Sequence, residues 1–423
     1  MRRRRHPRGS AIVANTAEKS SSPLNALLDV WVDDHLGLRQ VGVLEQWSEA
    51  GHAFQNTVAF YYLDGLTDAD AISITMPIRR APYQPRVAGL SGNLPPIFDQ
   101  NIPEGALRDY LIRRYLKVID NMGDFDLLRL AGNRSIGRVR VVPHGEQPVA
   151  GTPEAPPLSY VLANPDAQAP LKASARDFPY LAINEYLCLY AAQMSGLPTA
   201  KVQLSDDGQV LAITRFDRDA KGALLGFEDM ACLSALTAQD KYKGSYEDMV
   251  RTLSLMIEPA QRHEALAQVF KSIALSCVVG NGDAHLKNFG LLYADPTQAA
   301  QVAPAYDICC TVAYLREDQM ALSLNRSKRF PNRASLTRFG RTACRLSHKE
   351  VSAILADIAT GVESAAVELA YYRDQFPEFD VRAGEAMHTA WTSHMRMVLG
   401  LARTYTLPES LTAVGSHLDL EME

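Results

Sequence analysis

The stretch GNGDAHLKNFG, at residues 280–290, decides how this chain is interpreted, and PAYD follows it at residues 304–307. Together they place an acid, an amide and a second acid in the order Asp283, Asn288 and Asp307. Phosphoryl transfer requires this order, because one carboxylate orients a hydroxyl nucleophile while an amide and a second carboxylate hold Mg²⁺. If the three side chains converge in space, they form the active site of a kinase.

The segments on either side place this stretch on a loop. Residues 260–279 form an apolar-rich candidate helix that Gly280 ends, and residues 289–293 form a candidate strand. The polar residues between them therefore lie at one end of a rigid helix, which is where catalytic groups are usually placed. We expect a further turn to return Asp307 to the same site.

A plainer interpretation is that residues 281–283 only make a tight turn closed by Asx hydrogen bonds. That interpretation leaves four downstream residues unexplained, namely His285, Lys287, Asn288 and Asp307. The catalytic interpretation accounts for the set as a whole. We therefore favour it over the plain turn.

His285 and Lys287 have more than one possible role. His285 lies beside two possible metal ligands, so a transition-metal hydrolase is an alternative function. However, no second histidine is near, and oxygen and amide ligands suit Mg²⁺ better. We expect His285 to pack or orient the loop and include it among the candidate cofactor-binding residues. Lys287, a candidate catalytic residue, either meets a phosphate as a point charge or is simply solvated.

Two upstream residues are candidates for binding the nucleotide. Lys172 lies in the short strand-like segment 170–173, and Glu185 follows 13 residues later in a candidate helix that starts near Tyr180. Kinases position nucleotide phosphates with a strand lysine paired to a helix glutamate. A lone lysine and a lone glutamate are common, so the pair gains weight only from the downstream loop.

Composition indicates an ordinary globular protein. The chain has 423 residues, enough for two domains, with 47% hydrophobic and 22% charged residues. The net charge of −5 gives no global attraction to nucleic acid. Six scattered cysteines without a Cys-x-x-Cys pair predict buried thiols in a reducing compartment, and no zinc spacing is visible. The sequence has no apolar run of about 18 residues, so we expect no membrane span. We expect a cytoplasmic location.

The pattern along the chain predicts an α+β protein. We expect a β-hairpin from residues 28–32 and 39–44, a further β segment near 70–77, a helix at 107–118 and a strand at 137–142. Strand, helix and strand follow, and then mostly helices at 180–194, 246–256, 260–279, 347–376 and 381–404. A small mixed lobe before a larger helical lobe is the outline of a protein-kinase-like fold.

Composition shifts divide the chain into five parts. Residues 1–23 are predicted to be a disordered basic tail, 24–143 a small α+β N-terminal domain, 144–170 a Pro-rich linker, 171–410 the kinase-like domain and 411–423 a C-terminal tail. Residues 215–218 are a candidate hinge between lobes, or only a strand end with Arg–Asp pairing. Seven basic residues with no acid between them span 326–345. They form either a binding patch for phosphate, nucleic acid or an acidic partner, or simply a solvated face.

Several collinear segments together resemble the HipA family of serine/threonine kinases, the toxins of bacterial toxin–antitoxin pairs. The resemblance spans residues 24–410, and no single segment decides it. The segments are GNLPPIF at 92–98, PEG at 103–105, GNRSIG at 132–137, INE at 183–185, RFDR at 215–218, EDM at 228–230, KY at 241–242, the 281–288 loop and PAYD at 304–307.

The resemblance implies a set of roles. Asp283 would be the catalytic base, Asn288 and Asp307 the Mg²⁺ ligands, and Lys172 the nucleotide lysine, with ATP and Mg²⁺ as cofactors. Family members bind a helix-turn-helix antitoxin that represses their own operon, so DNA contact would be indirect. Some members phosphorylate aminoacyl-tRNA synthetases, which makes a protein of the translation apparatus a candidate substrate.

One segment departs from the family. Where the family carries a glycine-bearing phosphate loop with an autophosphorylated serine, residues 158–169 contain no glycine, so we expect that loop to be shortened or missing. This leaves two hypotheses. One is an active Mg²⁺–ATP-dependent protein kinase, and the other is a catalytically impaired pseudokinase that serves as a binding module or corepressor with an antitoxin.

Overall fold

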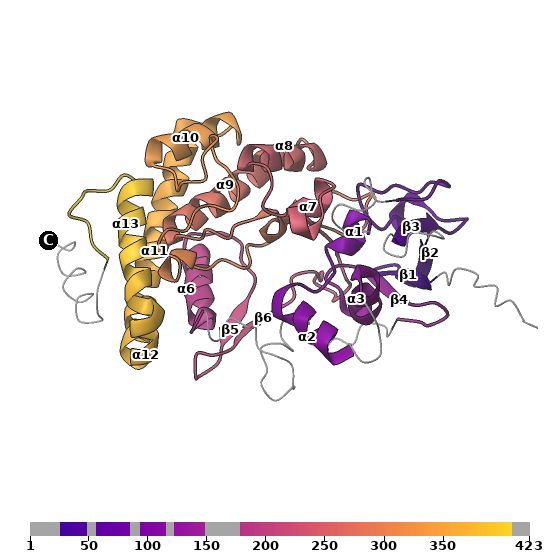
Figure 1. The fold of residues 1–423 in the computed structure, drawn as a ribbon. Helices are drawn as coiled ribbons and strands as arrows, with labels where there is room; N and C mark the ends of the chain where they lie inside the picture. Colours follow the sequence, from indigo (N-terminus) through magenta and orange to yellow (C-terminus); the bar gives the residue numbers. More distant parts are fainter. Residues whose placement is uncertain (1–25, 49–55, 85–93, 116–121, 149–177, 408–423) are drawn as a thin grey trace, which may run out of the picture.

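The computed structural model describes residues 26–48, 56–84, 94–115, 122–148 and 178–407. Lys172 lies outside these residues, as do the segment 158–169 and both predicted tails. Two hydrophobic cores are present within the described residues. One belongs to a sheet-based N-terminal unit and the larger one to a mostly helical C-terminal unit (Figure 1).

A four-stranded antiparallel sheet of order β3-β2-β1-β4 organises the N-terminal unit. Its strands are β1 (Ala26–Asp34), β2 (Gly37–Ser48), β3 (Asn56–Tyr62) and β4 (Val139–Pro143), and its helices are α1 (Pro96–Asp99), α2 (Gly105–Tyr115) and α3 (Asp124–Ala131). The alternating apolar residues of β1 give Leu28, Val30 and Val32 to the core, where none of them is exposed. The predicted hairpin is confirmed, with Asp34 paired to Gly37 across its turn.

The predicted β segment at residues 70–77 was wrong, because the backbone there bonds to side chains instead of to a neighbouring strand. The Ile72 amide donates to the Tyr62 hydroxyl at 3.0 Å, and the Ile74 amide donates to Glu228 Oε1 at 2.8 Å. Glu228 belongs to the C-terminal unit. The segment therefore joins the two units and does not extend the sheet.

The C-terminal unit alternates helices with short strands up to β9 and is helical from α10 onward. Its strands are β5 (Val202–Leu204), β6 (Leu211–Ile213), β7 (Gly226–Asp229), β8 (Gly290–Tyr293) and β9 (Gln301–Val302). Its helices are α6 (Leu181–Met194), α7 (Met230–Leu233), α8 (Tyr246–Met256), α9 (Arg262–Val279), α10 (Arg333–Thr342), α11 (His348–Gln375), α12 (Pro377–Phe379) and α13 (Glu385–Val398). This small mixed lobe and larger helical lobe match the predicted outline.

Local chemistry explains where the predicted helices begin and end. α11 starts at the capping box in which the Ser347 amide donates to Glu350 Oε2 at 2.7 Å and the Glu350 amide donates to Ser347 Oγ at 3.2 Å. The predicted helix at 381–404 is shorter than expected, because a π-turn occupies Asp380–Gly384 and α13 ends before Gly400 at φ 69°. Helix α10, which was not predicted, lies inside the basic cluster.

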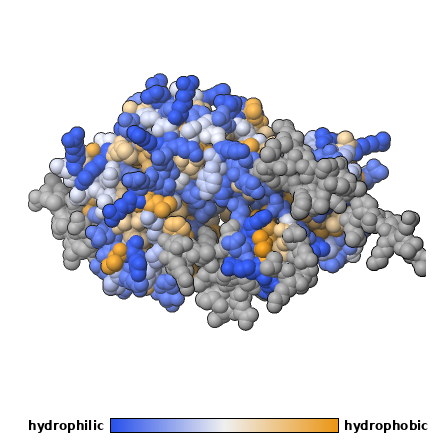
Figure 2. Space-filling view, viewed as in Figure 1, coloured by the Kyte–Doolittle hydropathy of each residue, from blue (hydrophilic) through white to orange (hydrophobic). Residues whose placement is uncertain are grey.

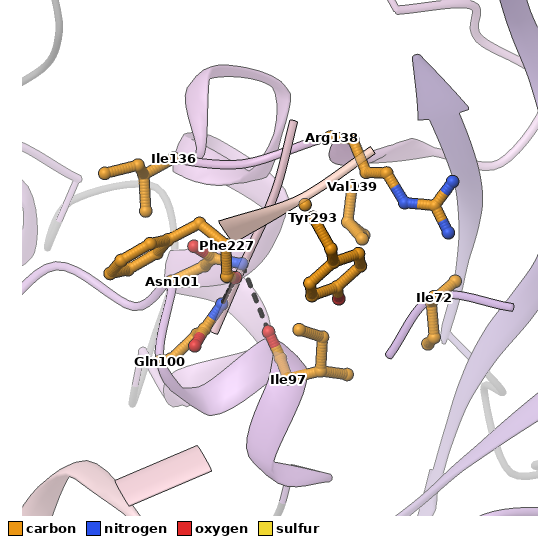
Figure 3. A pocket seen from close by; sticks show the side chains of 10 residues that line it. Ile72, Ile97, Gln100, Asn101, Ile136, Arg138, Val139, Phe227 and Tyr293 are labelled. Atoms are coloured by element: carbon orange, nitrogen blue, oxygen red, sulfur yellow. Dashed lines mark hydrogen bonds between the residues drawn. The ribbon is translucent and has the colours of Figure 1, made fainter. Parts of the chain in front are cut away.

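The two units meet along a packed seam, part of which is seen in Figure 3. Phe227 and Tyr293 of the C-terminal sheet face apolar residues of the N-terminal unit there. Gln100 Nε2 donates to the Phe227 carbonyl at 2.9 Å, and the buried Tyr293 hydroxyl donates to Glu228 Oε1 at 2.5 Å. The N-terminal unit is therefore anchored to β8, the strand that follows the 281–288 loop, and to β7, which pairs with β8.

The surface within the described residues is largely polar on the face shown in Figure 2, with hydrophobic residues scattered in small groups. In the described ranges no helix is both long enough and apolar enough to cross a membrane.

Candidate active site

The loop at residues 281–288 is held at the end of α9 by a left-handed Gly280, at φ 71°. The Gly282 amide donates to Thr311 Oγ1 at 2.7 Å. A Cβ on Gly282 would lie 2.6 Å from the Gln319 carbonyl oxygen, so the backbone passes too close to residues 318–319 for any side chain. The segment after Asp307 therefore fixes the position of the loop.

Asp283 presents its carboxylate at the surface of this loop, with 49% of the side chain exposed. The Tyr242 hydroxyl donates to Asp283 Oδ1 at 2.8 Å, and the other oxygen, Oδ2, lies 4.0 Å from His285 Nε2. The Asp283 amide also donates to Asn281 Oδ1 at 3.0 Å, which is the predicted Asx turn. The turn and an exposed, oriented carboxylate therefore occur together.

Asn288 and Asp307 are in direct contact. Asn288 Nδ2 donates to Asp307 Oδ2 at 2.6 Å, and the His285 amide donates to Asn288 Oδ1 at 3.0 Å. Asp307 has φ 55°, a left-handed conformation that is uncommon outside glycine and that clusters at functional sites. The structure thus brings Asn288 and Asp307 together and connects them to Asp283 through His285.

The donor set at this point fits a hard cation. Within the described residues no group of three or more His, Cys, Asp and Glu side chains is arranged to hold a metal ion. Asn288 and Asp307 supply instead one amide and one carboxylate. Mg²⁺ is usually bound by one or two carboxylates together with substrate phosphates and waters, so this pair suits Mg²⁺ better than a transition metal.

His285 is a packed side chain, 5% exposed, against the Tyr242 ring at a centroid distance of 5.2 Å. Burial lowers its pKa, which favours the neutral imidazole. Among the described residues its Nδ1 has no hydrogen-bond partner. These contacts agree with the expectation that it orients the loop, and a role of His285 in cofactor binding stays a prediction.

Lys287 was expected to meet a phosphate or to be solvated, and the structure places its ammonium differently. Nζ lies 2.7 Å from Glu104 Oε1 and 3.7 Å from Asp229 Oδ2, and it donates to the Gln100 carbonyl at 3.1 Å. Burial alone would lower the pKa of Lys287, but the carboxylates of Asp229 and Glu104 outweigh it and raise the pKa. Lys287 thus joins the catalytic loop to the N-terminal unit.

Glu104 is a residue whose role the sequence analysis missed. Its carboxylate bridges Lys287 and Lys241, with Lys241 Nζ at 2.8 Å from Oε2. Glu104 comes from the N-terminal unit, directly before α2, whereas both lysines come from the C-terminal unit. The signal was present in the sequence, since the segments 103–105 and 241–242 had been singled out, but only the fold shows that they meet.

Tyr242, which orients Asp283, was missed for the same reason. Helix α6 contributes through Asn184, which accepts from the Cys310 amide at 2.7 Å and donates to the Cys310 carbonyl at 3.0 Å. This tie holds the segment after Asp307 against α6. Glu185 is on the same helix and is buried, while its predicted partner Lys172 lies outside the described residues, so their pairing stays a prediction.

The segment 215–218 binds the N-terminal unit. Arg215 pairs with the fully buried Asp217, whose Oδ2 also accepts from the Gly137 amide at 2.7 Å. Phe216 stacks on Tyr306 at 5.2 Å between ring centroids. The charges therefore have the plainer role of ion pairing, and strand β6 ends at Ile213 before them.

The basic cluster at residues 326–345 lies on and before α10. Arg333 Nη1 donates to the Leu399 carbonyl at 2.5 Å, and Lys328 Nζ donates to the Ala321 carbonyl at 2.7 Å. Arg338 and Arg341 are exposed and line a shallow cavity of about 470 Å³. Whether this cluster binds a partner stays a prediction.

Comparisons with known proteins identify the family of the chain. A family model described as the HipA N-terminal domain matches residues 28–142, and one described as the HipA-like C-terminal domain matches residues 161–366. The protein named "Putative kinase Y4dM" from Sinorhizobium fredii is 30% identical over 288 residues, which cover 56% of this chain and 67% of that protein. "Putative kinase Y4mE" from the same organism is 24% identical over 349 residues, which cover 68% of this chain and 78% of that protein.

A solved structure shares the fold. The HipA chain in a complex of HipA, HipB and operator DNA from Shewanella oneidensis superimposes with a TM-score of 0.63 at 18% identity, covering 88% of this chain and 98% of that one. Both domains and the order of their elements are thus accounted for by one family. This chain belongs to the HipA family and has its kinase-like fold.

Proposed function

We propose that the protein is a Mg²⁺–ATP-dependent serine/threonine protein kinase that acts as the toxin of a toxin–antitoxin pair. The observation that carries the proposal is the contact of Asn288 with Asp307 beside an exposed, oriented Asp283. Membership of the HipA family and the kinase names of the relatives support it. The proposed substrate is a cytoplasmic protein, with the translation apparatus as the first place to search.

Asp283 is the proposed catalytic base. Because the Tyr242 hydroxyl occupies Oδ1, the carboxylate is held in one orientation while Oδ2 is left to accept a hydrogen bond from a serine or threonine hydroxyl. A base positioned in this way contributes about 10²- to 10⁴-fold to the rate.

Asn288 and Asp307 are the proposed ligands for Mg²⁺, and Lys172 with Glu185 would hold the nucleotide. When bound, Mg²⁺ neutralises charge on the transferring phosphoryl group. The protein's own part is to hold the Asn288 and Asp307 side chains next to each other, which the hydrogen bond from Asn288 Nδ2 to Asp307 Oδ2 supports.

The proposed partner is a helix-turn-helix antitoxin, through which the protein would contact operator DNA indirectly. The structural relative was solved with HipB and its operator DNA. The pairing is tested by a search for a small helix-turn-helix protein encoded beside this chain, coexpression of the two and gel filtration, where separate elution would reject it.

The activity is tested with γ-labelled ATP, Mg²⁺ and cell extract, in the absence of antitoxin. The expected result is label on at least one protein with the wild type and none with Asp283→Asn, which keeps the side-chain shape but removes the basic oxygen. Label that is independent of Asp283, or no label although ATP binds, would reject the kinase.

The second candidate is a pseudokinase that acts as a binding module or corepressor. It is favoured by residues 158–169, which lack the glycines of a phosphate loop. ATP with Mg²⁺ would then give no thermal shift, because only a ligand bound by the folded state stabilises it. A shift that Asp307→Ala abolishes would reject this candidate.

A further inference from the structure

A cavity of about 560 Å³ opens directly beside Asp283. Its walls come from segments far apart in the sequence, namely the start of α6, Tyr242, the Gly282–Asp283 turn, and residues 309–321 with Lys328. Its size lies within the range of about 300–1,000 Å³ that is typical of ligand sites. Because Asp283 is part of the wall, whatever occupies the cavity lies next to the proposed base.

One wall of the cavity is apolar and preformed. Phe178 packs edge-on against Tyr314 at 5.3 Å between ring centroids, and the Tyr314 hydroxyl donates to the Pro179 carbonyl at 2.9 Å. Leu315 also lines the cavity and is 50% exposed. Exposed leucine beside fixed aromatic rings is the usual lining of a site that binds an apolar group.

The lining also includes two carboxylates, of Asp283 and Asp318, and one ammonium, of Lys328. Asp318 accepts from the Thr311 hydroxyl and from the Gln319 amide, and Asp283 accepts from Tyr242. The ammonium of Lys328 already donates to the Ala321 carbonyl. The lining is thus negative on balance and disfavours a triphosphate, and neither Asn288 nor Asp307 lines the cavity.

We propose that this cavity binds the segment of the substrate protein that carries the acceptor hydroxyl, and that it selects a bulky apolar residue beside the acceptor. This inference rests on the proposed kinase function and adds the substrate class. In the transfer, the acceptor oxygen bonds to the γ-phosphorus of ATP, its proton passes to Asp283, and the bond from the γ-phosphorus to the bridging oxygen breaks. ADP departs with that electron pair.

The test is a peptide library with a fixed serine or threonine and each flanking position varied, phosphorylated by the full chain with labelled ATP and Mg²⁺. We expect leucine or phenylalanine at one flanking position to raise kcat/KM about tenfold or more over alanine, the scale at which apolar pockets discriminate. The variant Leu315→Ala should reduce this preference severalfold. Leu315→Glu should shift it toward lysine or arginine, an effect that a general loss of packing does not produce.

Leu255→Ala is the matched control, because Leu255 is 75% exposed on α8 and is not part of the cavity wall. It should leave the preference unchanged. Equal use of all flanking residues by the wild type, or an unchanged preference in both Leu315 variants, would overturn the inference and leave the kinase intact. Absence of any Asp283-dependent label on peptides or extract would instead remove the kinase and, with it, this inference.

Discussion

The substitution Glu104→Gln tests whether the N-terminal unit holds the catalytic loop in place. The Glu104 carboxylate accepts from Lys241 at 2.8 Å and lies 2.7 Å from the Lys287 ammonium. Glutamine keeps one acceptor oxygen but loses the charge, and the nearest carboxylate that remains to Lys287 is that of Asp229 at 3.7 Å, beside the neutral Gln100 carbonyl at 3.1 Å. Lys287 directly precedes Asn288, so the consequence should reach the site.

The size of the effect follows from these contacts. Hydrogen bonds to charged groups contribute about 1.5–3 kcal/mol each, and the Glu104 side chain is 35% exposed, which weakens them by solvent screening. We expect a loss of about 2 kcal/mol in the free energy of unfolding, measured by urea denaturation. We also expect label transfer to fall about ten- to hundredfold, because small displacements of catalytic groups cost this much.

The pH dependence supplies an internal check. Burial alone would raise the pKa of Glu104, but Lys287 and Lys241 outweigh it and lower the pKa below its usual 4.5. The stabilisation is therefore present above about pH 4.5 and is lost as the pH falls below it. Glu258→Gln, an exposed control, should change neither quantity. If Glu104→Gln behaves like this control at neutral pH, the reasoning is refuted.

Two further substitutions test other parts of the account. Burial raises the pKa of Asp99 from 3.8 to about 6, so its contribution to stability is full below pH 3.8 and is lost as the pH rises through 6. Asp99→Asn should accordingly raise the free energy of unfolding, measured by urea denaturation, by about 3 kcal/mol over the wild type at pH 7 and leave it unchanged near pH 3.5. An increase of the same size at both pH values would contradict this. Gly282→Ala should lower label transfer about a hundredfold, because the new Cβ meets the Gln319 carbonyl oxygen, whereas Gly123→Ala, with open space around it, should not. Full activity in Gly282→Ala would show that the loop tolerates displacement.

Much of the architecture could be predicted from local signals. The period-two pattern of residues 28–32 and the capping box at Ser347 are short-range features, and the structure contains both where they were expected. The prediction of a β segment at residues 70–77 was wrong, because the backbone there bonds to Glu228, which is distant in the sequence. Helix α10 was missed because its charged residues obscured a short apolar face of Leu336 and Phe339.

The candidate site divides in the same way. Asp283, Asn288 and Asp307 carry a recognisable spacing, and the structure brings them to one place. Tyr242 and Glu104 carry no spacing signal of their own, since each acts on the loop from another part of the chain. Lys287 was a candidate catalytic residue that would either meet a phosphate or be solvated, whereas its partners in the structure come from the N-terminal unit and from β7.

A crystal structure with Mg²⁺ and a non-hydrolysable ATP analogue tests the central claim most directly. The account predicts a cation about 2.0–2.1 Å from Asn288 Oδ1 and from a carboxylate oxygen of Asp307, with Asp283 facing the γ-phosphate. A cation held by other side chains, or a nucleotide bound away from these three residues, would contradict it.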